Sequence, residues 1–157
     1  MFIENPGRTE QLIKELVVIW EASVRETHTF LKEEDRISLR PYVQEALKEI
    51  DQLIVAYQDE KPVGFMGIEN QKVEMLFLEP ACIGQGIGKK LITKAIEEYG
   101  VSYVDVNEQN PHAADFYKRA GFVVFERTEK DEMGNPFPIL KMKLGSIMKT
   151  IGVKSKN

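Results

Sequence analysis

The chain has 157 residues, of which 43% are hydrophobic and 29% are charged, the balance of one globular domain with a single core. Its formal net charge of −4 argues against a nucleic-acid partner, because such partners favour a basic face. Cys82 is the only cysteine in the sequence, so an internal disulfide is excluded. No apolar run is long enough to span a bilayer, and the first residues lack the pattern of a signal peptide. We therefore expect one cytoplasmic domain over 1–145 and a flexible tail over 146–157.

The first third of the chain is predicted to be helical. Thr9 can cap a helix that runs to about Glu26, and the apolar residues inside it recur at helical spacing. A second helix is expected from Glu33 to Ile50, interrupted or restarted near Pro41, because proline lacks the backbone N–H that a continuous helix uses.

The rest of the chain alternates strands with helices. Short apolar segments predict strands over 53–58, 63–69, 73–79, 102–107, 122–129 and 137–144. Helices are expected over 86–99, ending at Gly100, and over 111–120, ending before Gly121. This order predicts a mixed α/β (α+β) fold with helices on both faces of one sheet.

The stretch LFLEPACIGQGIGKKL carries glycines at 84, 86 and 88, between a predicted strand and a helix. Unpaired N–H groups and the positive end of the dipole lie at a helix start, and glycines let a phosphate approach them closely. The spacing fits neither a P-loop nor the G-x-G-x-x-G of a Rossmann fold. A merely tight turn is the alternative interpretation.

Two segments give the chain a family resemblance. GQGIGKKL, following LFLEPA, resembles the acyl-CoA pyrophosphate loop of the GNAT superfamily of N-acetyltransferases, with Ile83 at a position where Arg or Gln is usual. NPHAADFYKRAGF, from Asn110 to Phe122, resembles the second coenzyme A segment of that family. The resemblance implies the GNAT fold, a mostly antiparallel sheet flanked by helices, over nearly the whole chain. Its first strand has the weakest signal, since MFIENP is short and polar.

The resemblance also implies a binding path for acetyl-CoA as co-substrate, with no metal. The strand segment before the loop would pair with the pantetheine arm, Asn110 would bond the arm from the other side, and the loop backbone would hold the pyrophosphate. The implied cofactor-binding residues are Leu76, Phe77, Leu78, Ile83, Gly84, Gln85, Gly86, Ile87, Gly88, Lys89, Asn110, Phe116 and Tyr117. From the sequence alone, Asn110 serves equally well as a helix N-cap.

Three residues are candidates for proton transfer. Tyr117 matches the family's general acid near sulfur, although its helical spacing also suits a core aromatic. Glu74 lies on the strand before the loop, where many members carry a catalytic glutamate, but a solvated edge residue would look the same. His28 is a candidate because the unperturbed pKa of histidine lies near neutrality and because the residue falls where the family covers its acceptor cleft. The alternative is a surface histidine at a helix end.

Other polar residues have weaker claims. Cys82 is expected to be a packing residue, because no histidine partner can be assigned and the family transfers the acyl group directly. His112 is expected to be exposed. Asn107 and Glu108 are candidate acceptor contacts, with a simple turn as the alternative.

These observations predict an enzyme that moves an acetyl group from acetyl-CoA to a primary amine in a ternary complex. A non-catalytic acyl-CoA-binding sensor or interaction module is the alternative. The acceptor remains open among protein lysines or N-termini, polyamines, amino acids and amine antibiotics. Neither nucleic acid nor membrane is expected as a partner, and the protein is expected to be a monomer or homodimer.

Overall fold

The computed structural model describes residues 1–28 and 31–145, so the predicted tail over 146–157 lies outside the described residues. The strands are β1 (Phe2–Glu4), β2 (Gln52–Gln58), β3 (Lys61–Glu69), β4 (Lys72–Leu78), β5 (Tyr103–Asn107), β6 (Phe122–Thr128) and β7 (Ile139–Leu144). The helices are α1 (Glu10–Thr27), α2 (Glu33–Glu49), α3 (Ile87–Tyr99) and α4 (Pro111–Arg119), with a short 3₁₀ turn at Pro80–Cys82.

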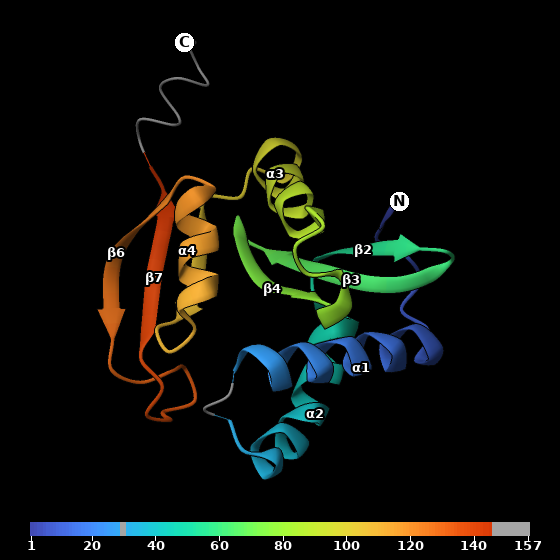
Figure 1. Ribbon diagram of the computed structural model, residues 1–157, viewed down its shortest axis with the longest axis horizontal. Coiled ribbons are helices and arrows are strands. Elements are labelled where there is room, and N and C mark those ends of the chain that lie inside the picture. Colours follow the sequence, from blue (N-terminus) through green and yellow to red (C-terminus); the bar gives the residue numbers. More distant parts are fainter. Residues whose placement is uncertain (29–30, 146–157) are drawn as a thin grey trace.

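The described strands form one seven-stranded sheet in the order β1-β2-β3-β4-β5-β7-β6 (Figure 1). All neighbouring pairs are antiparallel except β4 and β5, which run parallel. The predicted mixed, mostly antiparallel sheet is therefore confirmed. The weak first strand is also present, since Phe2 pairs with Ala56 at the edge of the sheet.

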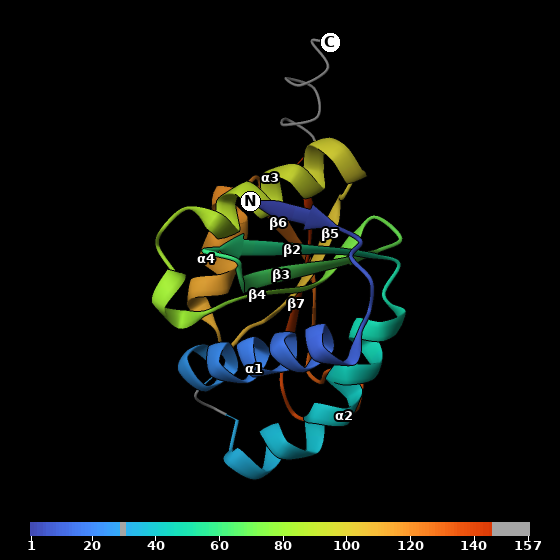
Figure 2. The same ribbon diagram turned by 90° about the vertical axis from the view of Figure 1, so that its right-hand side faces the viewer.

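Helices cover both faces of the sheet, as Figure 2 shows for α1 and α3. Strand residues alternate between the two layers: Val55 and Phe65 pack with α1 and α2, whereas Ile54 and Met66 pack with α3 and α4. The sheet is therefore packed against a hydrophobic core on each face. These two cores hold in place the strands that border the candidate site.

The two N-terminal helices differ from the prediction at one point. Thr9 caps α1 as expected, its hydroxyl oxygen accepting the Leu12 N–H at 3.1 Å. Helix α2, however, runs unbroken through Pro41, so the expected interruption is wrong. Leu47 is fully buried and Val43 partly buried against the layer formed with α1, and this burial offsets the hydrogen bond that the exposed proline cannot donate.

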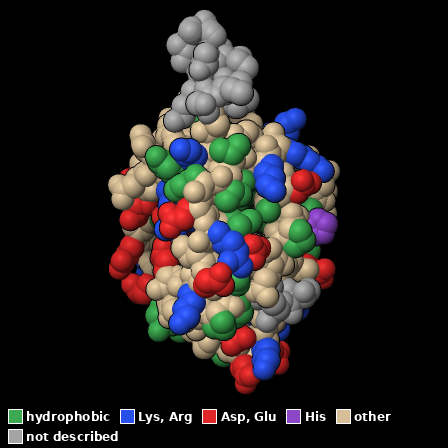
Figure 3. All heavy atoms as spheres, turned by 90° about the vertical axis from the view of Figure 1, so that its left-hand side faces the viewer, with side chains coloured by type: hydrophobic (Ala, Val, Ile, Leu, Met, Phe, Trp, Pro, Cys, Tyr) green, Lys and Arg blue, Asp and Glu red, His purple; other side chains and the backbone are tan. Residues whose placement is uncertain are grey.

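The outer strand β6 presents a mixed surface. Phe125 is about half exposed, lies edge-on to Tyr103 with ring centroids 6.2 Å apart, and sits 5.5 Å from the Lys143 ammonium group. On the side of the molecule shown in Figure 3, apolar side chains are interspersed with both acidic and basic ones. Among the described residues, no helix has the length and apolar character needed to cross a membrane.

Leu16→Ala is expected to lower the free energy of unfolding by about 2–5 kcal/mol, because Leu16 of α1 is fully buried and its removal leaves a cavity. Val18→Ala, on the exposed side of the same helix, should change it by less than about 0.5 kcal/mol. Urea unfolding of both variants measures the difference. Equal losses would contradict the assignment of this face of α1 to the core.

Candidate active site

The site is built around a parting of β4 and β5. The two strands pair only at Lys72 with Tyr103 and at Val73 with Val104. Beyond Val73, β4 continues to Leu78 with β3 as its ladder partner on one side only. Backbone N–H and C=O groups in a folded protein need hydrogen-bond partners. The N–H and C=O groups on the β4 edge that faces β5 can therefore form hydrogen bonds with an extended ligand.

A small cleft of about 110 Å³ opens where the strands part. Both strands and α4 line it, and the end of α1 reaches it through His28. His28, Glu74, Asn110 and Tyr117, which are widely separated in sequence, all line this one cleft. The backbone segment from Met75 to Phe77 lines it too, so most of the residues singled out from the sequence are brought together.

Tyr117 belongs both to the core and to the cleft. The residue is only 8% exposed, and its ring packs edge-on against Phe116 and Phe122, at centroid distances of 5.0 and 5.9 Å. Burial raises the pKa of the phenol well above its usual range, because the charged form is poorly solvated there. Tyr117 therefore remains a protonated O–H donor at neutral pH.

Asn110 is the N-cap of α4. Its Oδ1 accepts the Ala113 N–H at 3.2 Å, and its side chain is buried beside the cleft. The cap uses the carbonyl oxygen, whereas the amide Nδ2 makes no hydrogen bond to another described residue. One end of the side chain thus fixes the helix start and the other end is left as a donor.

Glu74 lies at the junction of three hollows. Besides the cleft, it lines a hollow of about 460 Å³ between β5 and the β6–β7 connection, and one of about 450 Å³ beside the end of α2. Burial raises the pKa of Glu74, and the nearby Lys72 ammonium group acts in the opposite direction. A carboxylate with a raised pKa is a stronger base than one in water.

His28 is the C-cap residue of α1, its N–H donating to the Val24 carbonyl at 2.8 Å. The imidazole Nδ1 lies 2.8 Å from the Thr27 hydroxyl. Burial lowers the pKa of His28, since an imidazolium loses solvation in a half-enclosed position. The ring is therefore neutral at pH 7 and is a poorer base than an exposed histidine.

The glycine loop lies at the far end of β4. Gly84 and Gly86 have φ values of +90° and +86°, and a Cβ at either would meet no atom within 4 Å. Their conformation favours glycine, while the space around them is open. Gly86 caps α3, whose first turn has no acidic residue, and the first helical bond is the one from Lys90 N–H to Gly86 O.

Packing joins this loop to the cleft. A Cβ at Gly88 would lie 3.4 Å from Phe116 of α4 and 3.5 Å from Leu78 of β4. The loop therefore sits directly after the open β4 edge, beside the residue that precedes Tyr117. Ile83, where the family usually carries Arg or Gln, is 50% exposed, and the exposed Gln85 bonds Gln58 at 3.0 Å.

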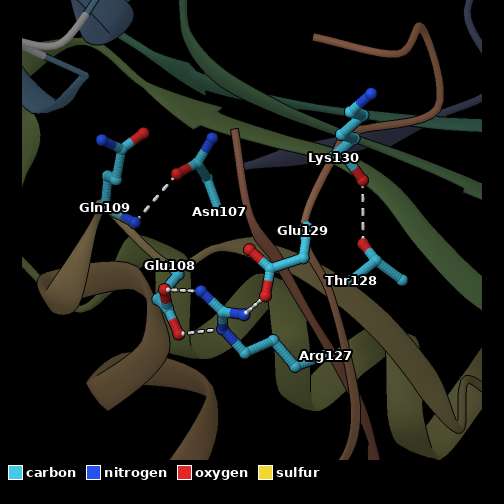
Figure 4. Close-up of polar contacts among 7 residues, drawn as sticks. All are labelled: Asn107, Glu108, Gln109, Arg127, Thr128, Glu129 and Lys130. Atoms are coloured by element: carbon cyan, nitrogen blue, oxygen red, sulfur yellow. Dashed lines mark hydrogen bonds and ion pairs between the residues drawn. The ribbon is translucent and has the colours of Figure 1, made fainter. Parts of the chain in front are cut away.

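Of the weaker candidates, Asn107 does line the cleft, where its Oδ1 accepts the Gln109 N–H at 2.9 Å. The other three lie outside it. Cys82 is buried with Ala56 and Val63, in agreement with a packing residue, and His112 is exposed. Glu108 is held by two hydrogen bonds from Arg127 of β6, at 2.7 and 2.9 Å (Figure 4). That ion pair lowers the pKa of Glu108 and ties the β5–α4 connection to the last hairpin.

Two charged residues of the site were not singled out from the sequence. Lys72 of β4 donates to Asp105 of β5 at 2.6 Å, and Asp105 lines both the cleft and the larger hollow beside it. Residues two apart on a strand share a face, so the K-x-E spacing of Lys72 and Glu74 was a usable signal. The position of Asp105 depends on β5 lying next to β4, which one-dimensional patterns do not specify.

Comparison with known proteins decides the family. The model of the acetyltransferase (GNAT) domain matches residues 18–144. The chain belongs to the GNAT acetyltransferases. This GNAT chain is 39% identical to the peptidyl-lysine N-acetyltransferase YjaB of Escherichia coli (strain K12) over 129 residues, which are 82% of this chain and 88% of that protein.

Solved structures agree with this membership. The solution structure of apo-form YjaB from Escherichia coli matches with a TM-score of 0.80 and 38% identity, over 91% of this chain and 97% of that one. The PaiA N-acetyltransferase of Thermoplasma acidophilum, solved in complex with coenzyme A, matches with a TM-score of 0.66 at 22% identity, over 91% and 99% of the two chains. The second likeness concerns the GNAT fold alone. The comparisons favour the acetyltransferase over the non-catalytic binding module.

His28→Gln is expected to weaken the pH dependence of folding stability. Because the folded-state pKa of His28 is lowered, the folded protein binds fewer protons than the unfolded chain, and stability falls as pH drops below about 6.5. Urea unfolding between pH 5 and 8 isolates this contribution as the difference between wild type and variant. His112→Gln controls for the loss of an exposed imidazole, and an equal effect of both changes would contradict the assignment.

Proposed function

We propose that the protein acetylates the side-chain amine of lysine in a peptide or protein, with acetyl-CoA as donor and direct attack of the amine on the thioester. The observation that carries the proposal is the meeting of Glu74, His28 and Tyr117 in one cleft beside the unpaired edge of β4. The peptidyl-lysine activity of YjaB and the coenzyme A complex of PaiA support the choice of acceptor and donor.

The donor would lie along β4 and end on the glycine loop. Amide groups of an extended arm can complete the ladder that β4 lacks beyond Val73. Further along, the open N–H groups at the start of α3 and the positive end of its dipole suit a pyrophosphate. Asn110, whose Nδ2 is not used by the α4 cap, can donate to the arm from the opposite wall.

The acceptor amine must lose a proton before it attacks, since the pKa of a lysine ammonium group is about 10.4. We assign the base to Glu74, because burial strengthens it as a base whereas burial weakens His28. His28 remains a neutral partner that can bond the incoming amine. The two hollows that flank Glu74, of about 460 and 450 Å³, leave room for the chain that carries the lysine.

Tyr117 would stabilise the departing thiolate by hydrogen bonding. Its phenol remains protonated in the cleft, so it can donate a hydrogen bond to sulfur as negative charge develops there. A free thiol has a pKa of about 8.5, below that of the buried phenol. Hydrogen-bond donation, more than complete proton transfer, is therefore the contribution that this environment favours.

The acceptor is tested by offering acetyl-CoA with a lysine peptide, spermidine, free lysine and an aminoglycoside, and measuring thiol release. We expect the lysine peptide to give the highest kcat/KM, with mass spectrometry placing the acetyl group on Nε. Faster turnover of a small amine would overturn the acceptor. A melting-temperature rise with acetyl-CoA but no thiol release from any amine would favour the binding module instead.

Tyr117→Phe is expected to lower kcat about a hundredfold, the usual scale for losing one positioned proton donor. The KM for acetyl-CoA should change less than about threefold, because the ring and its packing remain. Tyr42→Phe, at an exposed tyrosine on α2, is the matched control. An unchanged kcat in the Tyr117 variant would remove the residue from the mechanism.

Gly86→Ala is expected to weaken acetyl-CoA binding at least tenfold. A left-handed conformation costs a residue with a Cβ about 1–2 kcal/mol, and the added methyl group would project into the open space before α3. Gly100→Ala places the same strain at the other end of α3, where φ is +65°. Thermal shift with and without acetyl-CoA separates them: both variants lose stability, but only Gly86→Ala should show a smaller ligand-induced rise in melting temperature.

A further inference from the structure

Lys72 occupies the point where the β4–β5 ladder ends. It is one of the two β4 residues that still pair with β5. Its Nζ lies 2.6 Å from Asp105 Oδ2 and 3.8 Å from Glu74 Oε2. A longer contact of 4.0 Å reaches Glu132 in the connection between β6 and β7.

This cluster differs from an ordinary surface ion pair. The side chains of Lys72 and Asp105 are only 24% and 25% exposed, whereas exposed pairs are screened and contribute little. The Glu132 side chain is 88% exposed and is the weakest of the three partners. Burial acts to lower the pKa of Lys72. The hydrogen bond to Asp105 and the charges of the surrounding carboxylates outweigh this effect and raise the pKa. The Lys72 side chain is therefore protonated at neutral pH.

We propose that Lys72 is a positioning residue of the active site. It links β4 to β5 at the vertex of the cleft, the point where the two strands separate, and it keeps the Glu74 carboxyl group ionised so that Glu74 can act as the base. The proposal rests on the function proposed above, in which Glu74 accepts the proton of the amine. Lys72 itself does not line the cleft, and so it acts through Glu74 and Asp105.

The charges around Glu74 make this cation necessary. Negative groups approach Glu74 from several elements, and burial acts in the same direction by penalising its ionised form. The titratable and charged groups that face Glu74 or line a hollow with it are His28, Glu49, Glu69, Lys72, Asp105, Tyr117, Lys130, Asp131, Glu132 and Lys141. Among the described groups, Lys72 is the cation that contacts Glu74. Without it, Glu74 would hold its proton to higher pH, and a smaller fraction of the carboxyl groups would be free to accept one.

Lys72→Met is therefore expected to move the acidic limb of the kcat/KM profile to higher pH. On that limb kcat/KM should fall about tenfold, the consequence of losing one opposite charge at this distance, while the plateau at higher pH should change less than about threefold. Lys72→Arg keeps the charge and should restore the wild-type profile. A uniform loss at every pH, not restored by arginine, would show a structural role only and overturn the proposal.

Asp105→Asn is expected to shift the pH profile in the opposite direction. It leaves the Lys72 charge in place and removes one carboxylate that disfavours ionisation of Glu74. The acidic limb should therefore move to lower pH, against the direction of Lys72→Met. Shifts in the same direction in both variants would indicate general disturbance of the vertex and would contradict the proposal.

A measurement without turnover separates this inference from the proposed function. The Glu74 side-chain carboxyl carbon, labelled with ¹³C, is titrated by NMR in wild type, Lys72→Met and Lys72→Arg, with Glu74→Gln to assign the signal. We expect the midpoint to rise in the methionine variant and to be restored in the arginine variant. If no amine is acetylated, the proposed function fails while this titration still decides the role of Lys72, and an unmoved midpoint overturns it.

Discussion

The parting of β4 from β5 is the constraint on which the rest of the site depends. A parallel pair that stops after two residue pairs leaves peptide groups on one strand edge without a ladder partner, and folded proteins seldom leave such groups unsatisfied. Here the opening is held by packing on both sides: α1 and α2 fix β4 through one core, and α3 and α4 fix both strands through the other. The unsatisfied edge is thereby kept rigid and available instead of collapsing into a continued ladder.

One physical cause shifts the pKa of three titratable side chains that line the cleft. Partial burial penalises whichever form of a group is charged. It therefore raises the pKa of Glu74 and Tyr117 and lowers that of His28. This partial burial makes the carboxylate a stronger base even though the Glu74 side chain is still 40% exposed, and it keeps the imidazole neutral and the phenol protonated. The proposed division of roles therefore follows from charge type more than from special contacts.

Much of this arrangement could be predicted from local patterns. The Thr9 cap, the glycine stops and the apolar periods gave element positions within a few residues, because capping and alternation are local effects. Pro41 misled the prediction, since tertiary burial of Leu47 outweighs a local penalty. The partnership of Lys72 with Asp105 lay beyond any local pattern, because it depends on which strands become neighbours. The sequence placed Glu108 on a loop, but it could not predict the ion pair between Glu108 and Arg127 (Figure 4).

The place of β7 in the sheet bears on how the enzyme is made. It is the last described strand along the chain, yet it lies between β5 and β6 and is the strand that flanks β5 along all five of its residues. During synthesis, β5 lacks the strand that pairs with it along its full length until 139–144 have left the ribosome. Strands β2, β3 and β4 precede β5 and form an antiparallel meander of contacts that are local in sequence, so they can fold early. A nascent chain would therefore complete the scaffold of β2, β3 and β4 first and the β5 wall of the cleft last.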